Sequence, residues 1–402
     1  MKNIGDFLGL RRNILVMLAG VFALGLGEEL WSRFMPKYLE TLGAGIGIVG
    51  VFGTVRDLLD ALYQYPGGWL ADRLGHRRSL MVFALLAGAG YGILMLSQGW
   101  GLILVGMVFI MAWGSSAQPA IFAVIGDNLP ATRRSIGFGV QSILKRIPVV
   151  VAPVLGGWCI VRFGLGTGMK LGFAISLVLA GVAVLIIHLY YRDAPATPPG
   201  STSPMQVWRG FDSRLKRLLV ADCFARWAEG IPDVFIVLYA INVLRYDALQ
   251  FGTFISIQML TSIALYIPIA KLSDRRNRFP YVLLTFVFFA LYPLSILAAG
   301  GYVFTLLAFV VGGLREIGEP ARKAMIVDFA TQGSRGRVVG LYYFLRGMCV
   351  FPASLAGAWL WNLNPRLPFF VAFLAGGCGV LLFAALSRFA PPPKIEMQES
   401  LT

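Results

Sequence analysis

Charged side chains interrupt one apolar stretch of this chain at a spacing that suits solute binding. The stretch contains Arg315, Glu316, Glu319 and Arg322 around Pro320. On a helix, Arg315, Glu319 and Arg322 fall at positions i, i+4 and i+7, so they are predicted to form one stripe, split by a proline that frees a carbonyl. Because a guanidinium group binds carboxylate or phosphate through two hydrogen bonds, this stripe favours an anionic or zwitterionic ligand.

Two further apolar stretches carry ionisable residues. Glu29 and Arg33 are i,i+4 neighbours and are predicted to pair. Arg226 and Glu229 share one face of another predicted helix, which is expected to break at Pro232. Ionisable residues inside membrane spans are costly and usually line a cavity. The candidate substrate-binding residues are therefore Glu29, Arg33, Lys145, Arg226, Asp233, Arg315, Glu316, Arg322 and Arg346.

Three glutamates are the candidates for proton coupling: Glu28, Glu229 and Glu319. A carboxylate in a dry cavity takes up a proton more readily than one in water. Protonation of such a glutamate would release its basic partner for a substrate, which couples the two fluxes without covalent chemistry. An alternative stays open, in which these charges neutralise one another in a salt-bridge network that locks the helix around 315–323 to its neighbours.

Composition indicates which kind of element carries these charges. The chain has 402 residues, of which 57% are hydrophobic and 14% are charged, against about 25% charged residues in a soluble domain. The apolar runs are long and unbroken, which favours helices over a β-barrel. We therefore expect an all-α integral membrane protein with 12 transmembrane helices near 14–39, 46–71, 79–97, 101–126, 137–161, 168–191, 217–243, 249–271, 280–299, 303–328, 338–361 and 367–389.

The basic residues predict the orientation of these helices. Lys and Arg number 35 against 20 Asp and Glu, a net charge of +15. Loops on the side of the N-terminus, together with both tails, hold 21 of these basic residues, and the opposite loops hold 5. This bias places both termini in the cytoplasm. The positive charge is accordingly read as a topology signal, with no nucleic-acid partner expected.

Covalent and metal chemistry find little support in the sequence. Four scattered cysteines and two distant histidines, His76 and His188, have no metal or redox spacing. No serine-hydrolase or zinc-protease motif is present. We therefore expect no metal, no cofactor and no enzymatic activity.

The chain also repeats itself at about half its length. At an offset of 201 residues, Glu28 aligns with Glu229 and Asp127 with Asp328. Residues 192–216 are rich in proline and end in a basic run, which is typical of a linker. The predicted organisation is a six-helix bundle over 1–191, a cytoplasmic linker over 192–216, and a second, pseudo-symmetric bundle with a short tail over 217–402.

One loop motif identifies the family. The run from Gly67 to Arg78 reads GGWLADRLGHRR, and a degraded copy, AKLSDRRNR, occupies 270–278. The first run resembles the loop signature of the major facilitator superfamily (MFS), G-x-x-x-D-R-x-G-R-R, with His76 at one basic position. The resemblance implies the MFS fold over essentially the whole chain.

The same resemblance implies a gate. In the family, the aspartate at Asp72 caps a neighbouring helix, and the arginine at Arg73 pairs with an acid, here Asp127. This cluster acts as a latch on the outward-facing state. The alternative for the arginines is that they only anchor the cytoplasmic side. The residues assigned to the gate are Gly68, Asp72, Arg73, Gly75, Arg77, Asp127, Asp274 and Arg275.

These observations favour a secondary active transporter, a multi-pass protein of the plasma (inner) membrane. The family resemblance implies a monomer. It is expected to move a small polar organic solute, anionic or zwitterionic, by alternating access with proton coupling. The main alternative is a proton-driven antiporter that exports lipophilic drugs or cations. A non-transporting receptor and an intramembrane enzyme are disfavoured, because pathway charges suit neither and no catalytic motif is present.

Overall fold

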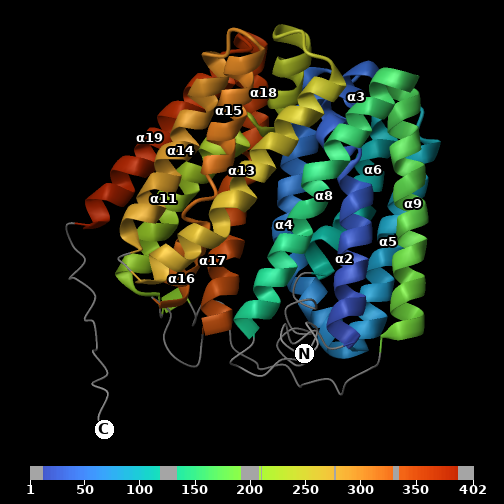
Figure 1. The fold of residues 1–402 in the computed structure, drawn as a ribbon, viewed down its shortest axis with the longest axis horizontal. Helices are drawn as coiled ribbons and strands as arrows, with labels where there is room; N and C mark the ends of the chain where they lie inside the picture. The colour runs from blue at the N-terminus through green and yellow to red at the C-terminus, as the bar shows by residue number, and fades with distance from the viewer. Residues whose placement is uncertain are drawn as a thin grey trace, which may run out of the picture.

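The computed structural model describes residues 12–117, 134–191, 208–209, 211–275, 278–328 and 335–387, and every regular element in these ranges is helical. Figure 1 shows long helices lying side by side in two groups, one blue to green and one yellow to red. Eight of the described helices are long and apolar enough to cross a bilayer, judged by length and composition. Within the described residues, the prediction of an all-helical protein is confirmed.

The first group is formed by α2 (Arg12–Glu29), the 3₁₀ turn η1 (Ser32–Phe34), α3 (Met35–Thr41), α4 (Ile46–Leu74), α5 (His76–Leu96), α6 (Trp100–Met111), the π-helical turn η2 (Ala112–Ser116), α8 (Arg134–Phe163) and α9 (Leu165–Tyr190). The second is formed by α11 (Ser213–Gly230), α12 (Asp233–Leu238), the π-helical turn η4 (Tyr239–Val243), α13 (Ala248–Arg275), α14 (Phe279–Leu297), α15 (Tyr302–Leu314), α16 (Glu319–Asp328), α17 (Arg335–Val350), α18 (Ala353–Leu363) and α19 (Leu367–Ser387).

Prolines and glycines break two of the helices at the charged segments. The predicted break at Pro232 is confirmed, because α11 ends at Gly230 and α12 begins at Asp233. The second break corrects a prediction. Residues 315–318 form turns between α15 and α16, so the i, i+4, i+7 stripe does not lie on one continuous helix. Pro320 lies in the first turn of α16, where its missing N–H costs nothing.

The physical reason for this second break is the close packing of Gly318. A Cβ atom there would lie 2.2 Å from the carbonyl oxygen of Tyr281 on α14. The backbone N–H of Gly318 donates to the hydroxyl of Thr285 at 2.5 Å instead of continuing a helix. The Thr285 side chain on α14 thus accepts the hydrogen bond from a backbone N–H that the sequence pattern assigned to a continuous helix over 303–328.

Glycines also let the two groups approach closely at one end of the bundle, the end where α3 finishes and α4 begins, which we call the Thr41 end (Figure 1). A Cβ atom at Gly252 of α13 would lie 2.2 Å from the carbonyl oxygen of Pro153 on α8. One at Gly50 of α4 would lie 2.5 Å from the Cβ atom of Ala358 on α18. Such backbone-to-backbone packing is typical of tight helix pairs in membranes.

A polar contact joins the groups at the same end. Lys37 of α3 donates to the carboxylate of Glu40 at 2.5 Å and to the side-chain oxygen of Asn242 in η4 at 2.6 Å. The amide of Asn242 donates in turn to Glu40 at 3.0 Å. The Thr41 end is therefore held closed by both backbone packing and a cross-group hydrogen-bond cluster.

We predict that Gly252→Ala weakens this closure. The added methyl group collides with the Pro153 backbone, and overpacking of this kind costs about 1–3 kcal/mol. The melting temperature of the purified protein should fall. The matched control is Gly181→Ala in α9, where a Cβ atom meets nothing within 4 Å. Equal melting temperatures for the two variants would contradict the assigned role of Gly252.

Candidate functional site

The second group of helices contains a buried ion-pair network centred on Asp222 of α11. Asp222 and Arg322 of α16 form a salt bridge, and each side chain is only 1% exposed. The same carboxylate accepts a hydrogen bond from the hydroxyl of Tyr342 at 3.0 Å and pairs with Arg346 of α17 at 3.4 Å. We call Asp222, Arg226, Glu229, Arg315, Glu319, Arg322 and Arg346 the Asp222 network.

Glu319 is the second acid of the Asp222 network. It accepts hydrogen bonds from Arg322 at 2.7 Å and from Arg226 at 3.2 Å. Lys323 lies 3.7 Å from the same carboxylate. Because a buried charge is tolerated only when it is paired and hydrogen-bonded, these contacts keep the network stable in an apolar interior.

Glu229 is the third acid and lies one residue before the end of α11. It accepts a hydrogen bond at 2.7 Å from Arg226, which was predicted to share its helix face, and pairs with Arg315 at 3.4 Å. The Arg315 guanidinium also lies over the ring of Tyr292, 4.3 Å from its centroid. Arg315, Glu319 and Arg322 are thus brought together by ion pairs rather than by a helical stripe. The network joins α11, α16 and α17. This arrangement matches the alternative in which these charges neutralise one another in a salt-bridge network between neighbouring helices.

Charged residues on α4 were missed by the sequence reasoning. Arg56 pairs with Asp57 at 3.0 Å and, across the two groups, with Asp233 of α12 at 2.6 Å. Asp60 accepts a hydrogen bond from the hydroxyl of Ser115 at 2.7 Å. Arg56, Asp57 and Asp60 interrupt an apolar stretch at positions i, i+1 and i+4. Charges within an apolar stretch were the signal that identified the other candidates.

A second cross-group ion pair involves α8. Arg146 pairs with Glu316 at 3.1 Å and donates a hydrogen bond to Ser262 of α13. Its guanidinium also lies over the ring of Tyr266, 4.6 Å from the centroid. Arg146 therefore reaches into the contact between the groups.

The first group supplies one predicted pair and two charges without a partner. Glu29 and Arg33 pair at 3.0 Å, as predicted, across the break between α2 and η1. Among the described residues, Glu28 and Lys145 form neither a hydrogen bond nor a salt bridge. Lys145 is exposed and Glu28 is partly buried.

Exposure separates these charges into two classes. Asp222 and Arg322 are sealed, whereas the side chains of Arg33, Arg56 and Asp233 are 38%, 34% and 28% exposed. Arg56 nevertheless lies ten residues into α4, about 15 Å along its axis. A charge exposed at such depth in a helix that crosses a membrane faces water rather than lipid. We therefore expect these side chains to face a polar, water-reachable space between the two groups.

The gate is described only in part. Gly68 lies within α4, whereas Asp127 and the side chains of Asp72, Asp274 and Arg275 lie outside the described residues. Gly75 adopts a φ of 79° between α4 and α5, a conformation that favours glycine. Arg73 is exposed at the end of α4, and Arg77 donates a hydrogen bond to the carbonyl of His188 on α9. The latch contacts stay a prediction.

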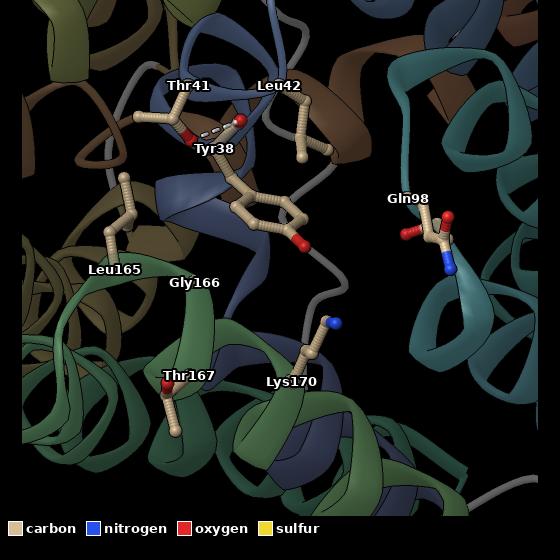
Figure 2. A pocket seen from close by; sticks show the side chains of 9 residues that line it. Tyr38, Thr41, Leu42, Gln98, Leu165, Gly166, Thr167 and Lys170 are labelled. Carbon is tan, nitrogen blue, oxygen red and sulfur yellow. Dashed lines mark hydrogen bonds between the residues drawn. The ribbon is translucent and has the colours of Figure 1, made fainter.

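A cavity of about 580 Å³ lies at the Thr41 end, and its lining includes Tyr38, Thr41, Gln98 and Lys170 (Figure 2). Lys170 is its one charged lining residue among those described, and none of the predicted site residues lines it. Nor do the described residues contain a group of three or more His, Cys, Asp or Glu that could hold a metal ion.

Asp222 supports a sharp stability prediction. The variant Asp222→Asn leaves Arg322 and Arg346 without their shared counter-charge, and removing one partner of a buried ion pair costs about 3–5 kcal/mol. We expect a large fall in melting temperature.

The matched control is Asp212→Asn. Asp212 caps α11 by accepting a hydrogen bond from the backbone N–H of Arg214 at 2.7 Å, and Arg214 lowers the pKa of this partly exposed carboxyl. Asparagine caps helices about as well as aspartate, so this control should melt close to the wild type. Indistinguishable melting of the two variants would show that Asp222 does not hold the network together.

The chain matches known membrane transporters over nearly its full length. The model of the Major Facilitator Superfamily matches residues 17–313 and 218–401. An uncharacterized MFS-type transporter of Methanocaldococcus jannaschii is 22% identical over 386 residues, which covers 93% of this chain and 94% of the relative. Multidrug resistance protein MdtH of Cronobacter sakazakii is 22% identical and covers 99% and 98%.

Solved structures agree on the fold. The peptide transporter POT in complex with sulfate superposes with a TM-score of 0.73 at 17% identity, covering 94% of both chains. A POT family transporter in complex with 5-aminolevulinic acid gives a TM-score of 0.75 at 14% identity, covering 96% of both. The family match, the fold and the loop motif lead to one conclusion: the chain belongs to the major facilitator superfamily and is a transporter of the MFS type.

Proposed function

We propose that this chain is a proton-coupled secondary transporter for a small polar organic solute, anionic or zwitterionic. The observation that carries the proposal is the Arg56–Asp233 pair, which joins the two groups of helices at 2.6 Å while about a third of the Arg56 side chain stays exposed. A purely structural pair at this depth has no reason to face water. A pair that opens and closes around a solute does.

The architecture that we propose follows the sequence prediction. Twelve spans form two six-helix bundles over 1–191 and 217–402, with the linker and both termini in the cytoplasm of a bacterial-type inner membrane. The Thr41 end is then the outer end, and its glycine packing corresponds to a state closed to the outside. Alternating access requires this closure to open while the gate around Asp72 and Asp127 closes.

Glu28 is the best-placed of the three candidate proton carriers. Protonation of Glu319 would break its hydrogen bonds from Arg322 and Arg226 and leave both guanidinium groups short of a counter-charge. Protonation of Glu229 would likewise disturb Arg226 and Arg315. Glu28 has no such partner among the described residues, so it can gain and lose a proton without dismantling the Asp222 network.

The surroundings of Glu28 explain how its proton would be coupled to the solute. Ionised Glu28 attracts Lys145 of α8 without a direct contact, and protonation of Glu28 removes this attraction. Lys145 is then free for a carboxylate on the solute, so proton and solute binding favour one another. The charged and titratable groups within electrostatic range of Glu28 are Glu29, Arg33, Arg56, Lys145 and Tyr91.

Export of lipophilic drugs or cations is the second candidate. It is favoured by the relatives named multidrug resistance protein MdtH, which match this chain over nearly its whole length. A thermal-shift screen of the purified protein at pH 5.5 and 7.5 separates the two. Stabilisation by anionic or zwitterionic metabolites supports our proposal, whereas stabilisation by lipophilic cations alone replaces it with drug export.

Transport in proteoliposomes tests the coupling. With the solute identified in that screen, an imposed pH gradient should drive accumulation by the wild type. Glu28→Gln should still exchange solute between the two sides but should lose pH-driven accumulation, because an amide cannot carry the proton.

The control is Asp247→Asn, an exposed carboxyl whose oxygen accepts the backbone N–H of Gln250, a contact that asparagine retains. This variant should accumulate solute like the wild type. Undiminished pH-driven accumulation by Glu28→Gln would refute the role of Glu28, and the absence of any pH-driven accumulation by the wild type would refute proton coupling.

A further inference from the structure

Most cations in the helical interior already have a carboxylate partner in the chain. This holds for eight basic side chains near the middle of the helices and at the contact between the groups: Arg33, Arg56, Arg146, Arg226, Arg315, Arg322, Lys323 and Arg346. A solute that bound one of them would first have to break an existing ion pair. Lys145, by contrast, forms no ion pair among the described residues and is exposed.

Two acids show the same lack of an ionic partner. Asp60 of α4 accepts a hydrogen bond from Ser115 but forms no salt bridge in the described part of the chain. Glu28 of α2 forms neither a hydrogen bond nor a salt bridge in the described part of the chain. Asp60 lies fourteen residues from either end of α4, about 21 Å along its axis, yet it is exposed. An exposed and unpaired carboxylate at this depth must face the water-reachable space between the groups.

These unpaired charges lie near one another on three helices of the first group. Lys145 on α8 is within electrostatic range of both Glu28 and Asp60. Among the described residues, Lys145, Glu28 and Asp60 therefore form a set of charges that lie within electrostatic range of Lys145 and have no salt-bridge partner. By contrast, the charged side chains of the Asp222 network and of the two cross-group ion pairs each have a partner of opposite charge within the protein.

We propose that Lys145 and Asp60 form the head-group site for a zwitterionic solute, in which Lys145 binds its carboxylate and Asp60 binds its ammonium group. Glu28 competes with the solute carboxylate for Lys145 until it takes up a proton. This inference rests on the proposed transport function and narrows its substrate class. The ligand is a small molecule that carries both an amine and a carboxylate, such as a free amino acid or a short peptide.

Charge balance favours a zwitterion over the other classes. A simple anion would bring a further negative charge beside Asp60 and would leave that carboxylate unpaired. A lipophilic cation would satisfy Asp60 but leave Lys145 desolvated without a partner, which is costly. A zwitterion satisfies both groups at once, and the protonated form of Glu28 adds no charge.

The test measures binding by thermal shift on the full-length protein at pH 5.5. The probes are free amino acids and dipeptides, each with its N-acetylated form, which is an anion, and its C-terminal amide, which is a cation. The wild type should bind the best zwitterion at least about tenfold more tightly than either blocked form, as expected for losing one charge-assisted hydrogen bond.

Two variants assign the ends of the ligand. Lys145→Gln should bind a zwitterion and its amide equally, because the carboxylate has lost its partner. Asp60→Asn should bind a zwitterion and its N-acetylated form equally. The controls, Lys170→Gln in the cavity at the Thr41 end and Asp247→Asn in the loop before α13, should keep the wild-type preference.

Several outcomes overturn the inference. They are a wild-type preference for anions or cations, no zwitterion-selective binding across the panel, or an unchanged preference in both Lys145→Gln and Asp60→Asn. The proposed function fails separately, in proteoliposomes. pH-driven uptake of a simple anion would keep proton-coupled transport and reject the zwitterion site. Zwitterion binding with the expected variant effects, but without pH-driven uptake, would keep the site and reject the coupling.

Discussion

The cost of an unpaired charge deep in a membrane protein is the constraint that organises this structure. An isolated charge in an apolar interior is unstable, so it must be paired, hydrogen-bonded or exposed to water. The Asp222–Arg322 pair satisfies the constraint by pairing, with each side chain 1% exposed. Lys145 and Asp60 satisfy it through exposure. The Arg56–Asp233 pair, at 2.6 Å, combines both solutions at the contact between the two groups.

In the function proposed above, this distinction separates the charges that stabilise the fold from those that take part in transport. The Asp222 network joins three helices of the second group and behaves as one rigid unit, because removing a member strands the others. The exposed charges lie on the facing helices, where each can exchange a protein partner for water or solute. Tight glycine packing at the Thr41 end, such as Gly252 against Pro153, lets the two rigid groups meet closely without large interdigitating side chains. A transporter needs both properties, rigid halves and a changeable interface.

Sequence reasoning succeeded where the relevant contacts are local. The Glu29–Arg33 and Arg226–Glu229 pairs follow from helical spacing, and the break before Asp233 follows from Pro232. It failed where partners lie far apart in the chain: 177 residues separate Arg56 from Asp233, and 100 separate Asp222 from Arg322. It also placed Arg315 on a continuous helix, because the spacing rule ignores the packing of Gly318 against Tyr281 that makes the chain turn. The charges of α4 were visible in the sequence and were overlooked.

The most direct test of the distinction between structural and transport charges uses one purified variant, Arg56→Gln. Its melting temperature and its transport are both measured, with the solute that stabilises the wild type. This change removes the cross-group pair with Asp233 but leaves the Asp222 network intact. The account predicts a small change in melting temperature and at least about a tenfold loss of uptake, the worth of one charged hydrogen bond. A large fall in melting temperature with normal uptake per folded molecule would contradict it and would make Arg56 a structural residue.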